Sequence, residues 1–460
     1  MIDFDPKTNK TICQMPFNHS ATTPTGDRLL CCVHKGPAIA HKKGIDEFWN
    51  SDKMKQIRLD TLSGKQVPEC ATCYKNEKAG VPSYRLMRVE QNPPDFWERF
   101  TEEELATGHL KQGPIDFDYR TLLCNLSCMH CGPGFSSTHG KLLEQMKDEL
   151  PKNDAGEIVG IGHARSIPGM KEGVAVDYEW DKILTQEMLD SVERRDLQQI
   201  YWAGGEPLMS NMHWDVMDRL SQLNIEEPEF TANIPIVYNT NLTRSTWKGK
   251  DAYEILSKFP KINIAPSIDG VGNTFNWIRD GGDWNKVEQN WKSLTTHIPE
   301  GTKVSVACVV TNLWIFDIDN FLNFFEQYNY PITPQGLLRH DIRYNVPRYQ
   351  ILDQIIFTHI LDVNWIPEDI IIPAMDYAIE RLQRSTVGAG ADTAIDIIKA
   401  ARIERIEKGD KMVSLAPRIK LYANFREKFK KDGVTFGSVL KETNTEAWMW
   451  YNSITPKWEC

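Results

Sequence analysis

The stretch that decides the fold reads Ile115-Asp116-Phe117-Asp118-Tyr119-Arg120, and three residues later Cys124-Asn125-Leu126-Ser127-Cys128-Met129-His130-Cys131. Apolar and polar residues alternate in the first part, which predicts a short strand. Three thiolates at the end of a strand can hold one cubane [4Fe-4S] cluster and leave one iron open, whereas a structural cluster takes four cysteines. The triplet alone leaves two alternatives, which are a zinc site with a distant fourth ligand and three reduced core thiols.

Three further motifs follow the cysteine triplet in order, and each comes directly after a predicted strand. They are Gly204-Gly205-Glu206-Pro207, Thr240-Asn241-Leu242-Thr243, and Ser267-Ile268-Asp269-Gly270 with Arg279 twelve residues after the serine. The two glycines allow a close approach of the backbone, and the glutamate can pair with an ammonium group. Each motif alone reads as a capped turn, but four motifs in this order argue for one common site.

These four motifs resemble those of the radical S-adenosylmethionine (SAM) superfamily, over roughly residues 112–345. The resemblance implies that Cys124, Cys128 and Cys131 hold the cluster and that its open iron chelates the amino and carboxylate groups of SAM. It also implies contacts between SAM and the residues Gly204, Gly205, Glu206, Pro207, Thr240, Asn241, Ser267, Asp269 and Arg279. His130 stands where the family usually has an aromatic residue near the adenine, and a solvent-facing turn residue is its alternative interpretation.

Helices and strands are predicted to alternate after the triplet. Strands are expected at 197–203, 234–239, 262–268 and 303–311, with helices between them and an apolar segment near 332–338. Repeated βα units imply a parallel sheet with helices outside it and a site at the C-terminal ends of the strands. We therefore expect an α/β fold, with a partial (β/α)6 TIM-type barrel at 111–345, a small cysteine-rich module at 1–110 and a helical region at 346–460.

Half of the ten cysteines precede the expected barrel. Cys70 and Cys73 form a Cys-x-x-Cys pair, which two distant cysteines can complete to a set of four ligands; a zinc ribbon is the alternative. The segment resembles the SPASM and twitch modules that bind auxiliary [4Fe-4S] clusters in radical SAM enzymes. The matching positions are Cys13, Gly26, Cys31, Trp49, Arg58, Gly64, Cys70, Cys73, Glu77, Gly80, Ser83 and Arg85.

This resemblance implies that Cys13, Cys31, Cys70 and Cys73 ligate one auxiliary cluster, with Cys32 as a competitor for Cys31. The chain departs from the usual arrangement, because the module precedes the barrel and offers cysteines for a single auxiliary cluster, as in a twitch domain. Of the remaining cysteines, Cys308 is expected to be a core thiol and Cys460 a mobile free thiol.

Some features allow two interpretations. Asp116 and Asp118 either line the barrel lumen or mark a charged strand end near solvent, and the segment 150–180 is either a lid or an exposed insertion. Helices are expected at 351–363, 375–382, 393–406, 418–430 and 436–442. Basic residues in this region are expected on a solvated helix face, with a dock for an acidic partner as the alternative: Arg418, Lys420, Arg426, Lys428, Lys430 and Lys431. Trp448, Trp450 and Trp458 are expected to pack the tail against the body.

The composition of the 460-residue chain suits a globular protein, with 41% hydrophobic residues. No apolar run reaches the roughly 18 residues of a membrane span, and the first residues lack a signal peptide, so we expect a cytoplasmic protein. In that compartment ten cysteines favour metal ligation over disulfides. The net charge of −10 gives no general attraction to nucleic acid or anionic lipid.

The resemblance implies the reaction. An external one-electron reductant such as flavodoxin or ferredoxin reduces the cluster, SAM is cleaved to methionine and a 5′-deoxyadenosyl radical, and the radical abstracts hydrogen from the substrate. The auxiliary cluster would accept an electron from the substrate or ligate it. Family members with such modules often modify peptides and others dehydrogenate sugars, so a peptide or protein substrate is expected, with a sugar-like small molecule as the alternative.

Two other protein classes are alternatives to a radical SAM enzyme. A zinc-dependent enzyme would hold zinc instead of iron. An iron–sulfur electron carrier or redox sensor would leave Glu206, Ser267 and Arg279 unexplained and would not bind SAM.

Overall fold

The computed structural model describes residues 2–78, 83–91, 95–146, 148–149, 159–160, 163–166, 176–297, 299, 302–328, 332–335, 359–387 and 390–457. The expectations for Gly80, for most of the segments 150–180 and 351–363, for Trp458 and for Cys460 lie outside these residues.

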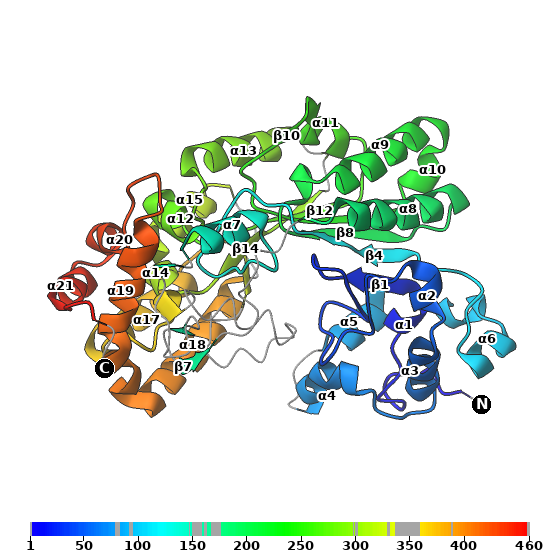
Figure 1. Cartoon of the computed structure of the whole chain (residues 1–460), viewed down its shortest axis with the longest axis horizontal. Helices are drawn as coiled ribbons and strands as arrows, with labels where there is room; N and C mark the ends of the chain where they lie inside the picture. Colours follow the sequence, from blue (N-terminus) through cyan, green and yellow to red (C-terminus); the bar gives the residue numbers. More distant parts are fainter. Residues whose placement is uncertain are drawn as a thin grey trace.

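The middle of the chain forms the expected parallel sheet, with helices on one face (Figure 1). Its strands are β4 (Asp116–Asp118), β5 (Arg120–Thr121), β8 (Gln199–Gly204), β9 (Ile236–Thr240), β12 (Ile262–Pro266), β13 (Lys303–Val304), β14 (Val306–Val309) and β15 (Ile332–Gln335). The helices are α7 (Ser137–Met146), α8 (Tyr178–Arg194), α9 (Asn211–Glu226), α10 (Pro228–Thr231), α11 (Ala252–Leu256), α12 (Gly272–Ile278), α13 (Trp284–His297), α14 (Asn312–Phe316) and α15 (Ile318–Glu326).

The order of the strands across the sheet is β13, β12, β9, β8 and β4, and each neighbouring pair is parallel. Beyond β12, the bridge between Ser267 and Ala307 leads to the parallel pair of β14 and β15. This arrangement confirms the α/β fold with a partial barrel.

The two faces of the sheet differ in burial. Along β9 and β12 every second residue is buried. Of these residues, Ile236, Tyr238, Ile262 and Ile264 join the large core under the helices. The residues between them, such as Asn239, Asn263 and Ala265, are only half-buried. Side chains alternate between the faces of a strand, so one face is packed and the other is the open inner face of the barrel.

The first hundred residues form a module with a core of its own, built around Phe48, Trp49 and Ile57. Its elements are α1 (Met15–Asn18), β1 (His19–Thr22), β2 (Asp27–Leu29), β3 (Ala40–His41), α2 (Ile45–Trp49), α3 (Asp52–Leu62), η1 (Pro68–Cys70), α4 (Ala71–Lys78), α5 (Tyr84–Gln91), η2 (Phe96–Arg99) and α6 (Glu102–Thr107). Strand β1 pairs with β4 in parallel, so the barrel sheet continues into the module (Figure 1). The domain boundaries expected from the sequence stay predictions.

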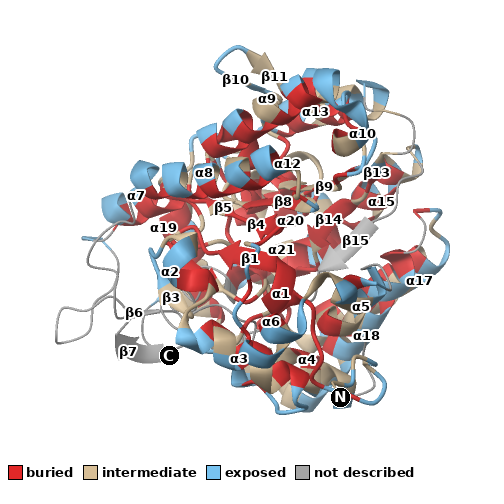
Figure 2. Ribbon diagram, turned by 90° about the vertical axis from the view of Figure 1, so that its right-hand side faces the viewer, coloured by how far each residue is buried: buried red, intermediate tan, exposed pale blue. Residues whose placement is uncertain are grey.

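The C-terminal region is helical, as expected. It comprises η4 (His359–Leu361), α17 (Glu368–Gln383), α18 (Gly390–Lys408), η5 (Gly409–Leu415), α19 (Ala416–Glu427), α20 (Phe436–Thr443) and α21 (Thr445–Ser453). These helices pack against α12, α14 and α15 of the barrel, and Figure 2 shows their buried faces continuing its core. Trp448 and Trp450 pack against this core as predicted.

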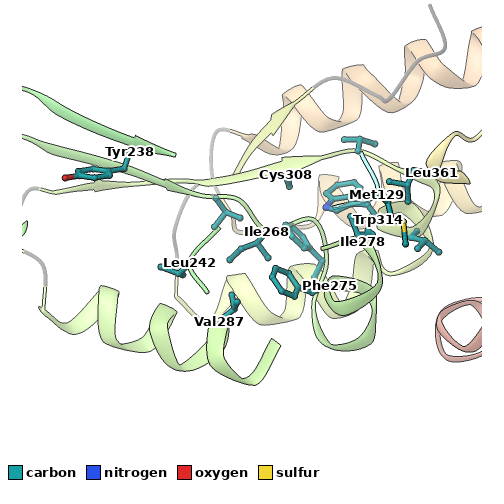
Figure 3. Packing of buried hydrophobic residues seen from close by; sticks show 14 of the residues in the cluster. Met129, Tyr238, Leu242, Ile268, Phe275, Ile278, Val287, Cys308, Trp314 and Leu361 are labelled. Atoms are coloured by element: carbon teal, nitrogen blue, oxygen red, sulfur yellow. The ribbon is translucent and has the colours of Figure 1, made fainter. Parts of the chain in front are cut away.

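The shared core reaches the cysteine triplet. Met129, which lies between two of the cysteines, is buried among Ile278, Trp314 and Leu361 (Figure 3). Cys308 is fully buried in the same core, which confirms the expected core thiol. Among the helices that the structure describes, none combines the length and the apolar character that crossing a bilayer requires.

Candidate functional site

The three cysteines of the triplet lie together in the loop that follows β5. Cys124 and Cys128 are buried, Cys131 is half-buried, and they form a small cluster with Leu126. Burial is the main cause that raises the pKa of each thiol, and the proximity of Cys128 further raises that of Cys131, to about 12. Buried thiols with raised pKa values become thiolates only when a metal supplies positive charge. This chemistry fits a metal-binding role.

The glycines of the second motif let the end of β8 approach the segment that leads into the cysteine loop. The Gly205 amide donates to Thr121 O at 2.7 Å and the Glu206 amide to Leu123 O at 2.8 Å. A Cβ atom on Gly205 would overlap the carbonyl of Leu123, and Gly204 has a φ of +99°. The glycines were expected to admit a ligand, and in the structure they admit the backbone of the neighbouring strand.

Glu206 is completely buried beside the triplet. Its carboxylate accepts hydrogen bonds from the Thr240 hydroxyl at 2.8 Å, the Asn241 amide at 2.6 Å and the Leu208 amide at 3.2 Å. Burial nevertheless raises the pKa of Glu206 to about 7. A carboxylate held this way gains from a cationic partner, because pairing offsets the loss of hydration.

The third motif touches the first cysteine. The side-chain nitrogen of Asn241, Nδ2, lies 3.8 Å from the Cys124 sulfur and donates to Asn125 Oδ1 at 3.1 Å. Asn125 in turn donates to the Thr243 hydroxyl at 2.9 Å. The sequence analysis did not single out Asn125, although its place inside the triplet was a signal.

The fourth motif reaches the second cysteine. Asp269 is fully buried, forms an ion pair with Arg279 at 2.7 Å and accepts the Val309 amide at 2.8 Å. Arg279 also hydrogen-bonds to Cys128 and lowers the pKa of that thiol, opposing the larger effect of burial. Ser267 lies half-buried at the end of β12, and no hydrogen bond from its side chain connects it to the cysteines.

His130 belongs to the same group. Its Nε2 atom lies 3.5 Å from Asp269 Oδ2, and burial lowers the pKa of its imidazole to about 4, so the ring is neutral near pH 7. Its Nδ1 atom is buried without a hydrogen-bond partner among the described residues. An unpaired buried nitrogen at this point fits a bound group that supplies a hydrogen bond. The adenine contact expected for His130 stays a prediction.

The N-terminal cysteines form a second group of thiols. Electrostatic interactions link Cys13 with Cys70 and Cys73, and Cys31 with both Cys70 and Cys13. Cys32 differs, since it is hydrogen-bonded to Tyr84 and faces Asp118 and Arg120. Cys31 also interacts with Cys32, and the choice of Cys31 as the fourth ligand stays a prediction.

Other positions of the N-terminal motif hold this cysteine group in place. Arg85 binds Glu77 through two contacts of 2.9 and 2.5 Å and donates to Ile12 O at 2.8 Å, next to Cys13. Ser83 donates to the same glutamate at 2.5 Å. Farther away, the fully buried Arg58 stacks on Trp49 at 4.5 Å and donates to Pro16 O and Gly108 O.

The aspartates of β4 are buried and paired, so the solvent-facing interpretation was wrong. Asp116 pairs with Arg88 and with His19, and Asp118 binds Arg120 through two contacts of 3.0 and 2.9 Å. Both Asp118 and Arg120 interact electrostatically with Cys32. The sequence analysis missed Arg120, whose position beside Gly204 only the folded sheet reveals.

Two family comparisons match these two sites. Residues 119–324 match the radical SAM superfamily, and residues 13–74 match the SPASM family, an iron–sulfur cluster-binding domain. The chain contains a radical SAM domain. It belongs to an enzyme family that uses a [4Fe-4S] cluster with SAM, and its SPASM domain, which binds an auxiliary iron–sulfur cluster, precedes the barrel.

Solved structures of this kind resemble the radical SAM protein only distantly. The anSMEcpe enzyme with bound AdoMet is 17% identical, with 49% of this chain and 53% of that chain covered and a TM-score of 0.30. SuiB of Streptococcus suis bound to the precursor peptide SuiA is 14% identical, with 69% and 60% covered and a TM-score of 0.34. The chain thus spans little more than half the length of these proteins. No curated protein matches the chain significantly.

Proposed function

We propose that this protein cleaves SAM reductively at the cluster site of Cys124, Cys128 and Cys131 and uses the resulting radical to abstract hydrogen from a peptide or protein residue. The observation that carries the proposal is the convergence of the later motifs on this triplet, with Asn241 at the Cys124 sulfur and Arg279 at Cys128. The cluster, when bound, supplies the electron that splits SAM into methionine and a 5′-deoxyadenosyl radical.

The surrounding residues would bind and orient SAM. Glu206 offers a buried carboxylate to the SAM ammonium group, and Arg279 offers a buried cation to its carboxylate. Thr240 and Asn241 hold Glu206 in place, and Asp269 holds Arg279. All of these side chains are buried, so the site also keeps water away from a reactive species.

The open inner face of the barrel supports a neutral, extended substrate. Its half-buried residues include Tyr201, Asn239, Asn263 and Ser267, which offer hydrogen bonds without charge. The charged pair of Asp118 and Arg120 lies near Tyr201, and its two members pair with each other at 3.0 and 2.9 Å. Peptide amides suit such a surface, because they need paired donors and acceptors rather than ions.

The same surface would accept a sugar, so a small-molecule dehydrogenase is the second candidate. The electron would come from a small one-electron carrier such as flavodoxin or ferredoxin, and the auxiliary cluster would accept an electron from the substrate.

The first test measures 5′-deoxyadenosine after anaerobic reconstitution with iron and sulfide and incubation with SAM and dithionite. Production that is lost in Cys128→Ala supports the proposal. A wild-type protein that holds zinc, or that holds iron but neither binds nor cleaves SAM, contradicts it.

The second test identifies the substrate class. Protein and small-molecule fractions from cells grown in deuterated medium are added separately, and deuterium in 5′-deoxyadenosine is measured. Deuterium transfer from the protein fraction, abolished by prior proteolysis to free amino acids, supports a peptide or protein substrate. Transfer from the small-molecule fraction alone favours the sugar-like alternative.

A further inference from the structure

The last turn of α19 carries a buried cation to the back of the cysteine loop. Arg426 is completely buried, and its Nη2 atom donates to the Ser127 carbonyl at 2.6 Å, across a separation of 299 residues. Ser127 directly precedes Cys128. The sequence placed Arg426 on a solvated helix face, and this interpretation was wrong.

Asp280 connects this arginine to the loop from the barrel side. Its carboxylate pairs with Arg426 at 2.7 Å and accepts the Ser127 hydroxyl at 3.0 Å, and its carbonyl accepts the Ser127 amide at 2.8 Å. Lys430, whose side chain is 1% exposed, pairs with the other Asp280 oxygen at 3.2 Å and donates to Asn276 O at 2.9 Å.

The loop is also held through its backbone. The Met129 amide donates to Ile278 O at 2.8 Å, next to the Ser127–Asp280 contact. A Cβ atom on Gly281, where φ is +90°, would lie 3.1 Å from Asn125 O. The loop and the segment after α12 therefore pack backbone to backbone. Arg426 of α19, the red-orange helix of Figure 1, contacts both of them.

Charged side chains of both signs lie behind Cys128. On one side Asp269 pairs with Arg279, and on the other Asp280 faces two cations, Arg426 and Lys430. Lys430 shares its charge with the half-exposed Asp432 at 3.3 Å. Arg426 and Asp280 both interact electrostatically with the Cys128 sulfur, with opposite signs. Because the region is buried, solvent screens these interactions weakly.

We propose that the C-terminal helices tune the reduction of the radical SAM cluster, with Arg426 and Lys430 as positioning residues that make its one-electron reduction easier. This inference rests on the proposed function. One electron from the reductant enters the oxidised cluster and adds one negative charge behind Cys128. A buried cation stabilises that charge, while Asp280 opposes it and orients both cations.

A purely structural clamp would have a different signature. Loss of any clamp contact would loosen the loop and shift the cluster potential without regard to the charge removed. An electrostatic role requires opposite shifts for Arg426→Gln and Asp280→Asn, and little shift for Arg426→Lys, which keeps the charge. Arg405 provides a matched control, because it is a fully buried arginine of α18 whose contacts are with Ile366, Gly409 and Asp410.

The experiment is a redox titration of the reconstituted full-length protein without substrate, followed by electron paramagnetic resonance. The signal is the one that Cys128→Ala lacks, which separates it from the auxiliary cluster. We expect Arg426→Gln to lower the ratio of reduced to oxidised cluster at the wild-type midpoint about tenfold, a shift of about 59 mV for one electron. Lys430→Gln should shift the midpoint in the same direction, Asp280→Asn in the opposite direction, and Arg405→Gln not at all.

Each result decides a different claim. Equal midpoints for wild type and Arg426→Gln, with the Cys128-dependent signal intact, would overturn the inference and leave the proposed function standing. Shifts of one sign in Arg426→Gln and Asp280→Asn would also overturn it in favour of a clamp. If Asp280→Asn does not fold, the other three variants still test the electrostatic role. That role requires lower midpoints in Arg426→Gln and Lys430→Gln and little shift in Arg426→Lys. A wild-type protein without any Cys128-dependent signal would end the proposed function and this inference together.

Discussion

Two adjacent cysteines at the N-terminal site lie in different surroundings, and a pair of variants can separate them. Cys31 interacts electrostatically with Cys13 and Cys70, whereas Cys32 forms a hydrogen bond with Tyr84. We predict that Cys31→Ala loses about four of the roughly eight irons of two cubane clusters, and that Cys32→Ala keeps them all. Iron and sulfide analysis of both reconstituted proteins measures this. The reverse pattern would assign the ligand to Cys32.

Glu206 makes SAM binding depend on pH. Its pKa of about 7 reflects burial, and pairing with an ammonium requires the ionised form. Below pH 7 the residue must lose a proton when SAM binds. We therefore expect the affinity for SAM to fall about tenfold for each unit by which the pH drops below 7. Glu206→Gln should weaken binding by about 1.5–3 kcal/mol and remove this dependence. Equilibrium dialysis with the cluster-loaded protein measures both effects.

The control for Glu206 is Glu254→Gln, which changes an exposed glutamate of α11. It should bind SAM like the wild type and keep the same pH profile. An unchanged profile in Glu206→Gln would show that another group titrates.

At the scale of elements, the contact between β8 and the cysteine loop depends on a missing side chain. Gly205→Ala would place a methyl group against the Leu123 carbonyl, and backbone cannot move aside as a flexible side chain can. We expect a loss of about 1–3 kcal/mol in the free energy of unfolding and a lower occupancy of the radical SAM cluster. Gly113→Ala is the control, since its Cβ meets only Arg194 at 3.7 Å. Denaturant unfolding and iron content measure the difference, and equal losses in both variants would contradict the argument.

The order of the barrel elements could be predicted because each βα unit carries its own apolar pattern. The helix α12 was not predicted. In α12 the sequence Gly272-Asn273-Thr274 is a weak helix former, and the helix forms because Phe275 and Trp277 are buried in the core.

The cysteines and the later motifs could be recognised from order and spacing. Arg426 could not, because no local pattern connects it with Ser127, which lies 299 residues away.

At the scale of the whole molecule, a shared sheet and buried ion pairs join the N-terminal module, which contains the SPASM domain, to the barrel. Strand β1 pairs with β4. Arg28 in β2 is completely buried, lies 2.6 Å from Glu187 of α8 and donates to the Tyr119 hydroxyl at 2.8 Å. Glu187 also accepts the Ile45 amide at 2.9 Å. Both halves should therefore unfold together.

Glu187→Gln tests this coupling. The variant leaves the Arg28 guanidinium buried without its carboxylate, which typically costs about 3–5 kcal/mol of the free energy of unfolding. We expect one thermal transition at a lower temperature, in which the absorbance of both clusters and the far-ultraviolet circular dichroism change together. The control is Glu193, which also lies on α8 and forms an exposed ion pair with Arg219 of α9. Glu193→Gln breaks this pair and should leave the transition temperature unchanged. Two separate transitions in Glu187→Gln, with the SPASM domain melting first, would mean that the domain folds independently and that the shared sheet does not couple the halves.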